Sequence, residues 1–72
     1  MASPVFHRFY RRYTVQRMDV NSKRWTDCET FGDQAGAERA MREMVNKDPS
    51  IRAGRVFDQM TKQAEAEYRP ER

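Results

Sequence analysis

The apolar residues between positions 33 and 48 recur with the spacing of an amphipathic helix. Those at i, i+3, i+4, i+7 and i+8 are Ala37, Ala40, Met41, Met44 and Val45. This spacing places them on one face of a helix with about 3.6 residues per turn. Asp33 can accept hydrogen bonds from first-turn amides, and Pro49 cannot continue a helix. The sequence therefore predicts a helix over residues 33–48.

Residues 13–31 have the composition and turn chemistry of a β-hairpin. Residues 13–20 are rich in strand formers, and their apolar parity changes in a way that predicts a bulge near Arg17. Polar turn residues follow at 21–23, and residues 24–31 again contain aromatic and β-branched side chains. We expect the two strands to pair antiparallel and to pack against the helix.

Residues 51–57 admit two interpretations. As a strand, Ile51 to Phe57 would carry a bulge at Gly54. As a helix, the segment would join an apolar stripe that continues to Tyr68. We favour the strand, because Gly54 costs a helix about 1 kcal/mol and because a two-stranded hairpin alone is barely stable.

Residues 59–69 are predicted to be a C-terminal helix under either interpretation, with Met60, Ala64 and Tyr68 on its inner face and Pro70 ending it. The predicted fold class is α+β. An antiparallel sheet of two or three strands packs against one amphipathic helix, and a C-terminal helix completes the domain.

Length and composition place the chain among small single domains. A chain of 72 residues forms one domain of marginal stability. Cys28 is the only cysteine and His7 the only histidine, which excludes an internal disulfide and a Cys/His zinc site. We expect a cytoplasmic protein without cofactor, because the sequence has neither a signal-peptide pattern nor an apolar stretch that could span a membrane.

Charge is distributed unevenly along the chain. Residues 1–25 contain six basic residues and one acid, whereas residues 26–50 contain three basic residues and six acids. The first segment, residues 1–12, is both basic and aromatic, and its spacing fits a helical turn as well as an edge strand; we prefer the extended form. The candidate binding residues of this basic third are Arg8, Tyr10, Arg11, Arg12, Arg17, Lys23, Arg24 and Trp25.

The residue pairs that could support catalysis are better explained structurally. Cys28 and His7 lack a third group to orient them, and so small a domain has little room for a pocket. Asp27 and Glu29 are two residues apart on a predicted strand, where such acids are usually exposed and paired. The glycines form no phosphate-binding loop. We therefore predict a protein without catalytic activity.

The basic, aromatic third has three interpretations. Its aromatic residues can fill the core while the arginines keep an edge strand soluble. It can be a docking surface for another protein, since interfaces favour Arg, Tyr and Trp. It can also contact nucleic acid, because arginine binds phosphate and aromatic rings stack on bases.

The order hairpin, helix, strand resembles a broad group of small bacterial and phage proteins with a ββαβ unit. The resemblance covers residues 13–57, including a Trp-containing second strand at 24–31 and an Ala- and Met-rich helix. The pattern is also similar to that of several small anti-CRISPR proteins, which dock without catalysis on a CRISPR effector complex. Many of those imitate DNA with acidic surfaces, whereas this chain has a net charge of +3.

From these observations we expect a non-catalytic binding protein, an inhibitor or modulator of phage or mobile-element origin. Its expected partner is a protein complex that handles nucleic acid, such as a CRISPR effector. The alternatives are a module that binds DNA or RNA directly and a structural homodimer.

Overall fold

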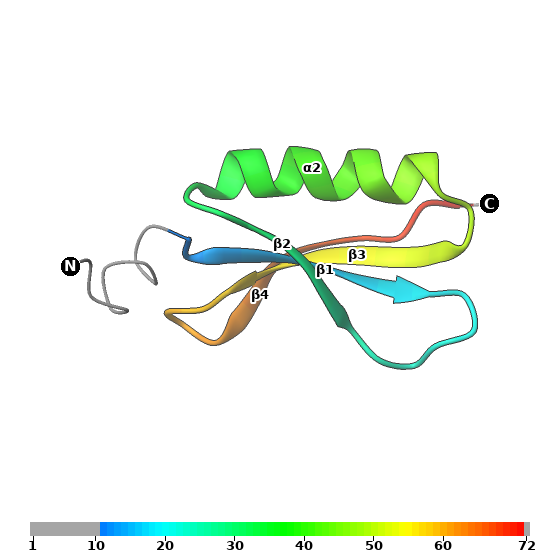
Figure 1. The fold of residues 1–72 in the computed structure, drawn as a ribbon, viewed down its shortest axis with the longest axis horizontal. Coiled ribbons are helices and arrows are strands. Elements are labelled where there is room, and N and C mark those ends of the chain that lie inside the picture. Colours follow the sequence, from blue (N-terminus) through cyan, green and yellow to red (C-terminus); the bar gives the residue numbers. More distant parts are fainter. Residues whose placement is uncertain (1–10, 72) are drawn as a thin grey trace.

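The computed structural model describes residues 11–71, which form four strands and one helix (Figure 1). In chain order the elements are β1 (Tyr13–Asp19), β2 (Thr26–Phe31), α2 (Gln34–Lys47), β3 (Ile51–Asp58) and β4 (Gln63–Tyr68). The α+β class is confirmed. Of the expected basic and aromatic segment 1–12, residues 1–10 lie outside the described residues, and with them its expected extended form.

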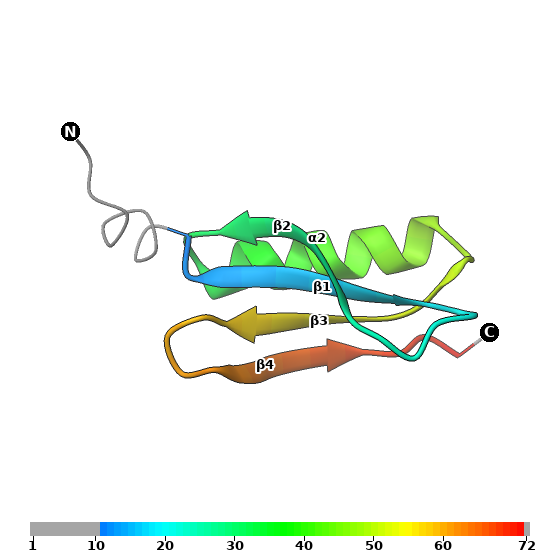
Figure 2. The same cartoon turned by 60° about the horizontal axis from the view of Figure 1, so that its bottom comes forward.

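The four strands form one antiparallel sheet in the order β2-β1-β3-β4. Helix α2 connects β2 to β3 and covers one face of the sheet, so the fold has two layers (Figure 1). The opposite face is turned toward the viewer in Figure 2, and no helix of the described chain lies on it. We call this the open face. Antiparallel sheets commonly bury one face and leave the other in solvent.

Helix α2 begins and packs as its sequence pattern predicts. The Asp33 side chain caps it by accepting a hydrogen bond of 2.8 Å from the Gly36 amide. Its buried residues are Ala37, Met41 and Val45, which belong to the predicted apolar stripe. They form one core with Val15, Ile51 and Val56 of the sheet. A helix of this length is barely stable in water from its helix propensity alone, so its stability comes from burying this apolar stripe.

The predicted C-terminal helix over residues 59–69 is wrong, and so is the estimate of two or three strands. Residues 63–68 form the edge strand β4, in which Ala66 pairs with Val56 and Tyr68 with Gly54. Ala66 and Tyr68 pack against the core. The Tyr68 hydroxyl donates a hydrogen bond of 2.9 Å to Oδ1 of Asn46 on α2. Pairing and core contact outweigh the helix propensity of this Ala- and Glu-rich segment.

The segment 51–57 is a strand, and residue 58 extends it. Gly54 is present for a different reason than the expected bulge, since it pairs in register with Arg17 and Tyr68. A Cβ atom at this position would lie 2.7 Å from Met41 Cγ and 2.7 Å from Val45 Cγ2. The helix therefore approaches the sheet so closely over Gly54 that only glycine fits.

The strand β1 is irregular on both sides of the position where a bulge was predicted. Its register shifts between Val15 and Gln16 against β2, and between Met18 and Asp19 against β3. From Val15 to Met18 the strand pairs with β3 in continuous register, so these two residues lie on opposite faces of the sheet, and both are buried. No helix in the described part of the chain is long and apolar enough to cross a bilayer.

Candidate binding surface on the open face of the sheet

Strand β3 places Arg55 and Phe57 on the open face. Its neighbours Gly54 and Val56 face the helix: Gly54 lies beneath Met41, and Val56 belongs to the core. Side chains alternate between the two faces of a strand, so Arg55 and Phe57 point the other way. Both are partly buried.

Arg55 is held from three sides on this face. Its guanidinium carbon lies 4.4 Å from the centroid of the Trp25 ring and 5.7 Å from that of Phe57. Its Nε donates a hydrogen bond of 2.6 Å to Oε1 of Gln16, and Gln16 Nε2 donates one of 2.7 Å to Oδ1 of Asp27. We call these five residues the Arg55 cluster. The two cation–π contacts and the hydrogen bond fix the plane of the guanidinium.

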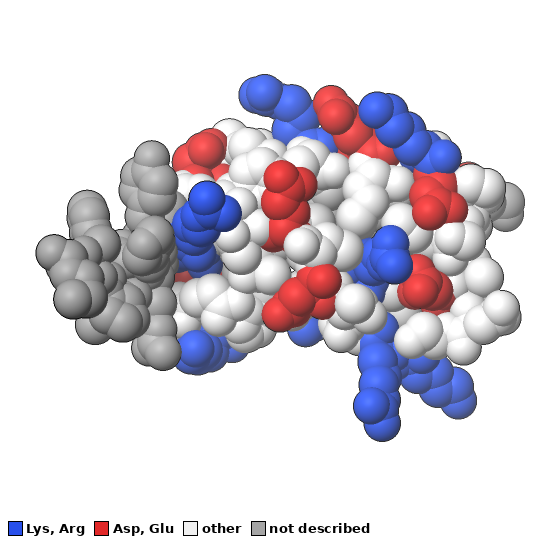
Figure 3. Space-filling view, viewed as in Figure 1, with Lys and Arg blue, Asp and Glu red and all other residues white. Residues whose placement is uncertain are grey.

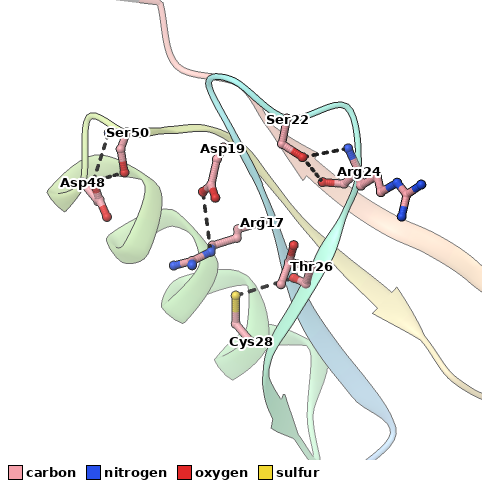
Figure 4. A network of polar contacts seen from close by, with 8 residues as sticks. All are labelled: Arg17, Asp19, Ser22, Arg24, Thr26, Cys28, Asp48 and Ser50. Carbon is pink, nitrogen blue, oxygen red and sulfur yellow. Dashed lines mark hydrogen bonds and ion pairs between the residues drawn. The ribbon is translucent and has the colours of Figure 1, made fainter.

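Trp25 reaches the cluster because the loop between β1 and β2 is held by its own polar groups. The Ser22 hydroxyl accepts a hydrogen bond of 3.0 Å from the Arg24 amide and donates one of 3.3 Å to the Arg24 carbonyl (Figure 4). The Ser22 amide donates to the Asp19 carbonyl at 3.0 Å, and the Val20 amide to the Ser50 carbonyl at 2.9 Å. The loop is thereby attached to the start of β3, where Asp48 accepts two hydrogen bonds from Ser50 (Figure 4).

The charges around the Arg55 cluster are not balanced within the described chain. Asp27 is engaged by Gln16, and Glu67, the β4 residue paired with Arg55, forms an ion pair with Arg69. Ion pairs among residues 11–71 are formed by Arg12, Arg17 and Arg69 only. Arg55 has no carboxylate partner within this range.

Lys23 and Arg24 lie beside Trp25 in the loop, and both are exposed. In Figure 4 the Arg24 side chain points away from the other labelled residues. Figure 3 shows Lys and Arg side chains projecting below the sheet at the end where this loop lies. This end of the molecule therefore presents positive charge next to the Arg55 cluster.

The structure separates the predicted site residues into four groups. Arg8 and Tyr10 lie outside the described residues. Lys23, Arg24 and Trp25 lie together beside the open face. Arg11 is exposed near the other end of β1, where its Nη1 lies 3.4 Å from the Thr30 hydroxyl.

Two of the predicted arginines are engaged within the fold. Arg12 donates two hydrogen bonds to the buried carboxylate of Asp58, at 2.9 and 2.8 Å. Arg17 pairs with Asp19 at 3.6 Å (Figure 4).

Sequence reasoning did not identify Arg55 and Phe57 as site residues. Their i, i+2 spacing shows that they share one face of a strand. This spacing indicates an exposed site only when the helix is known to cover the opposite face.

The contact between Arg12 and Asp58 is structural. Hydrogen bonds from Arg12, Met60 and Thr61 hold the pKa of Asp58 at about 2, below its ordinary value of 3.8, although burial opposes this. The same contact raises the pKa of Arg12. The pair ties the start of β1 to the end of β3 and organises the turn into β4.

Cys28 is the single cysteine of the chain, and its thiol contacts the backbone of its own strand, β2. Desolvation raises the pKa of the Cys28 thiol, whose sulfur lies 3.6 Å from the Thr26 carbonyl (Figure 4). A raised pKa lowers the fraction of reactive thiolate. Within residues 11–71 no three His, Cys, Asp or Glu side chains are grouped so that they could hold a metal ion.

Comparison of the chain with models of protein families, with curated proteins and with solved structures finds no match.

Proposed function

We propose that this protein is a non-catalytic binding module that docks on another protein through the open face of its sheet. The observation that carries the proposal is the Arg55 cluster. It combines Trp, Arg and Phe in a fixed arrangement on a face that no helix of residues 11–71 covers. These residue types dominate the energetically important centres of protein interfaces.

Preorganisation supports the same conclusion. An exposed arginine ordinarily loses side-chain entropy when a partner immobilises it. Arg55 is already restrained by Gln16 and by two rings. A partner that contacts Arg55 would therefore bind a side chain that is already ordered, and little further side-chain entropy would be lost.

The partner that we propose is a protein of a complex that handles nucleic acid, on which this chain acts as an inhibitor or modulator in the manner of anti-CRISPR proteins. The small size of the domain and the order of hairpin, helix and strand from β1 to β3 support this class, and β4 is an addition to that order. The basic loop beside the Arg55 cluster would face acidic protein surface in such a complex.

Direct nucleic-acid binding is the alternative, and the open face supports it less well. Asp27 and Glu67 lie on either side of Arg55 and would repel a phosphate chain that crosses the sheet. The rings of Trp25 and Phe57 already contact Arg55. These contacts would compete with the stacking of the rings on bases.

The proposal is tested by capture from a bacterial extract on the immobilised full chain, before and after nuclease treatment. We expect a specific protein complex to be retained after nuclease treatment and to be lost with Trp25→Ala. Retention that requires nucleic acid, or a mobility shift of free DNA or RNA whose log affinity falls linearly with log salt, would replace the proposal by the alternative. A solution mass of twice the chain mass that depends on Trp25 would instead indicate a structural homodimer.

A further inference from the structure

The open face has a chemical preference that can be derived from Arg55. The Nε atom of this residue is used by Gln16. Its two terminal nitrogens form no hydrogen bond with any side chain or carbonyl of residues 11–71. A guanidinium that is fixed in orientation and has free terminal donors is suited to a planar anion with two oxygens.

We propose that the Arg55 cluster is a binding site for a carboxylate on an acidic segment of the partner protein. This inference rests on the proposed function, and it adds the chemistry of the partner. An Asp or Glu side chain would accept two hydrogen bonds from the terminal nitrogens of Arg55. Trp25 and Phe57 would exclude water from the guanidinium on both sides of the contact.

Charge complementarity supports an acidic occupant. The basic residues of this region are Arg55, Lys23, Arg24 and Arg69, and its acids are Asp27 and Glu67. Glu67 is in an ion pair with Arg69, whereas Asp27 is bound by the neutral Gln16 and keeps its charge. The basic residues outnumber the acids, so the region is positive overall. A partner segment with several acids would contact Arg55 with one of them and the loop cations with others.

A carboxylate is favoured over a phosphate chain by the acids that remain on the face. A nucleic acid carries a charge at every nucleotide and must pass close to Asp27 or Glu67 while it contacts Arg55. A peptide can place a carboxylate at Arg55 and neutral or apolar residues opposite those two acids. The same face can therefore accept a peptide without repulsion at its edges.

The helix provides a matched control. Arg42 lies 5.4 Å from the centroid of the Tyr68 ring, so it makes the same type of cation–π contact as Arg55 on the other side of the sheet. Replacing either arginine by lysine keeps the net charge and removes the planar fork. Only Arg55→Lys should affect a ligand that binds to the open face.

The experiment is an NMR titration of the isotopically labelled full chain at low ionic strength. The probes are a peptide in which glutamate residues alternate with neutral residues and an oligo-thymidine strand of equal length. We expect the peptide to shift the Trp25 indole and Arg55 Nε–H resonances in a saturable manner. We also expect Arg55→Lys to weaken this binding about fivefold to tenfold, and Arg42→Lys to leave it unchanged.

Three results would overturn the inference. One is stronger binding of oligo-thymidine than of the glutamate-containing peptide at the same resonances. The second is an equal effect of the two lysine variants, and the third is the absence of a shift with either probe. These results are separable from failure of the proposed function: if Trp25→Ala still abolishes capture of a protein complex, the open face is a docking surface whose partner contacts it without a carboxylate.

Discussion

The guanidinium of Arg12 donates two hydrogen bonds, of 2.9 and 2.8 Å, to the carboxylate of Asp58 across 46 residues of chain. The Asp58 side chain is 2% exposed, whereas that of Arg12 is 36% exposed. The carboxylate also accepts hydrogen bonds from the amides of Met60 and Thr61. One buried acid thus connects the beginning of β1, the end of β3 and the turn that leads to β4.

This arrangement predicts how stability depends on pH. The folded-state pKa of Asp58 is about 2 and its ordinary value is 3.8. Stability from this group is therefore fully present above the ordinary pKa and is lost as the pH falls through the interval toward about 2. Denaturant unfolding should show that the free energy of unfolding of the parent chain falls between pH 6 and about 2. The fall should be much smaller in Asp58→Asn. A pH dependence identical in the variant and the parent chain would contradict this assignment.

Asp58→Asn should also lower the melting temperature by several degrees at neutral pH. The amide has one acceptor oxygen where the carboxylate has two, so one of the two Arg12 hydrogen bonds is lost. Asp33→Asn is the matched control, since asparagine caps a helix about as well as aspartate. Thermal unfolding followed by circular dichroism compares the two. Equal melting temperatures would show that the Arg12 contact contributes nothing.

Gly54→Ala should destabilise the fold by about 1–3 kcal/mol, because the added methyl group overlaps Met41 and Val45. Gly36→Ala is its control. A Cβ atom there would lie 3.0 Å from Oδ1 of Asp33, whose side chain can move, and the helix gains propensity of about 1 kcal/mol. Denaturant titrations should therefore show a clear loss for position 54 and a smaller change for position 36. A neutral Gly54→Ala would mean that helix and sheet are less closely packed.

The contact between Arg55 and Trp25 should be measurable as a coupling energy of about 0.5–1 kcal/mol in a double-mutant cycle with alanine. Trp25 is the only tryptophan, so its fluorescence reports the same contact. The emission spectrum should change in Arg55→Ala and stay constant in Arg42→Ala. A coupling energy of zero would remove the preorganisation on which the proposed binding surface depends.

The helix and the first hairpin were predictable because their signals are local. Asp33, Pro49 and the apolar stripe between them define α2 within a single stretch of sequence. Strand β3 was chosen over a helix on the cost of Gly54. The structure gives that glycine a tertiary role, in the close approach of Met41, which no local pattern could indicate.

Strand β4 was missed for two physical reasons. Its Ala and Glu residues have high helix propensity, which outweighed the alternation of Ala64, Ala66 and Tyr68 with two acids. The turn before it also contains no glycine, asparagine or proline. Lys62 adopts the left-handed conformation there, with φ of 62°, and its amide donates a hydrogen bond of 2.8 Å to the Asp58 carbonyl. The one typical turn former at this point is Asp58, whose side chain accepts hydrogen bonds from the amides of Met60 and Thr61, and a single aspartate is a weak sequence signal.

The candidate site was predictable only in part. Lys23, Arg24 and Trp25 were identified from their types, and the loop brings them to the edge of the open face. Arg55 was not identified, because it joins Trp25 only through the pairing of β1 with β2 and β3. Arg12 is of the right type and lies in the right segment, yet its hydrogen bonds to Asp58 give it a structural role.

The central claim is that the open face, and not the helix, is the binding surface, and one comparison tests it most directly. The amount of partner complex that the immobilised chain captures from nuclease-treated extract is measured for Arg55→Ala and for Arg42→Ala, after circular dichroism has shown both to be folded. We predict that Arg55→Ala captures little or none and that Arg42→Ala captures as much as the parent chain. Equal capture by the two variants, or a loss confined to Arg42→Ala, would contradict the claim.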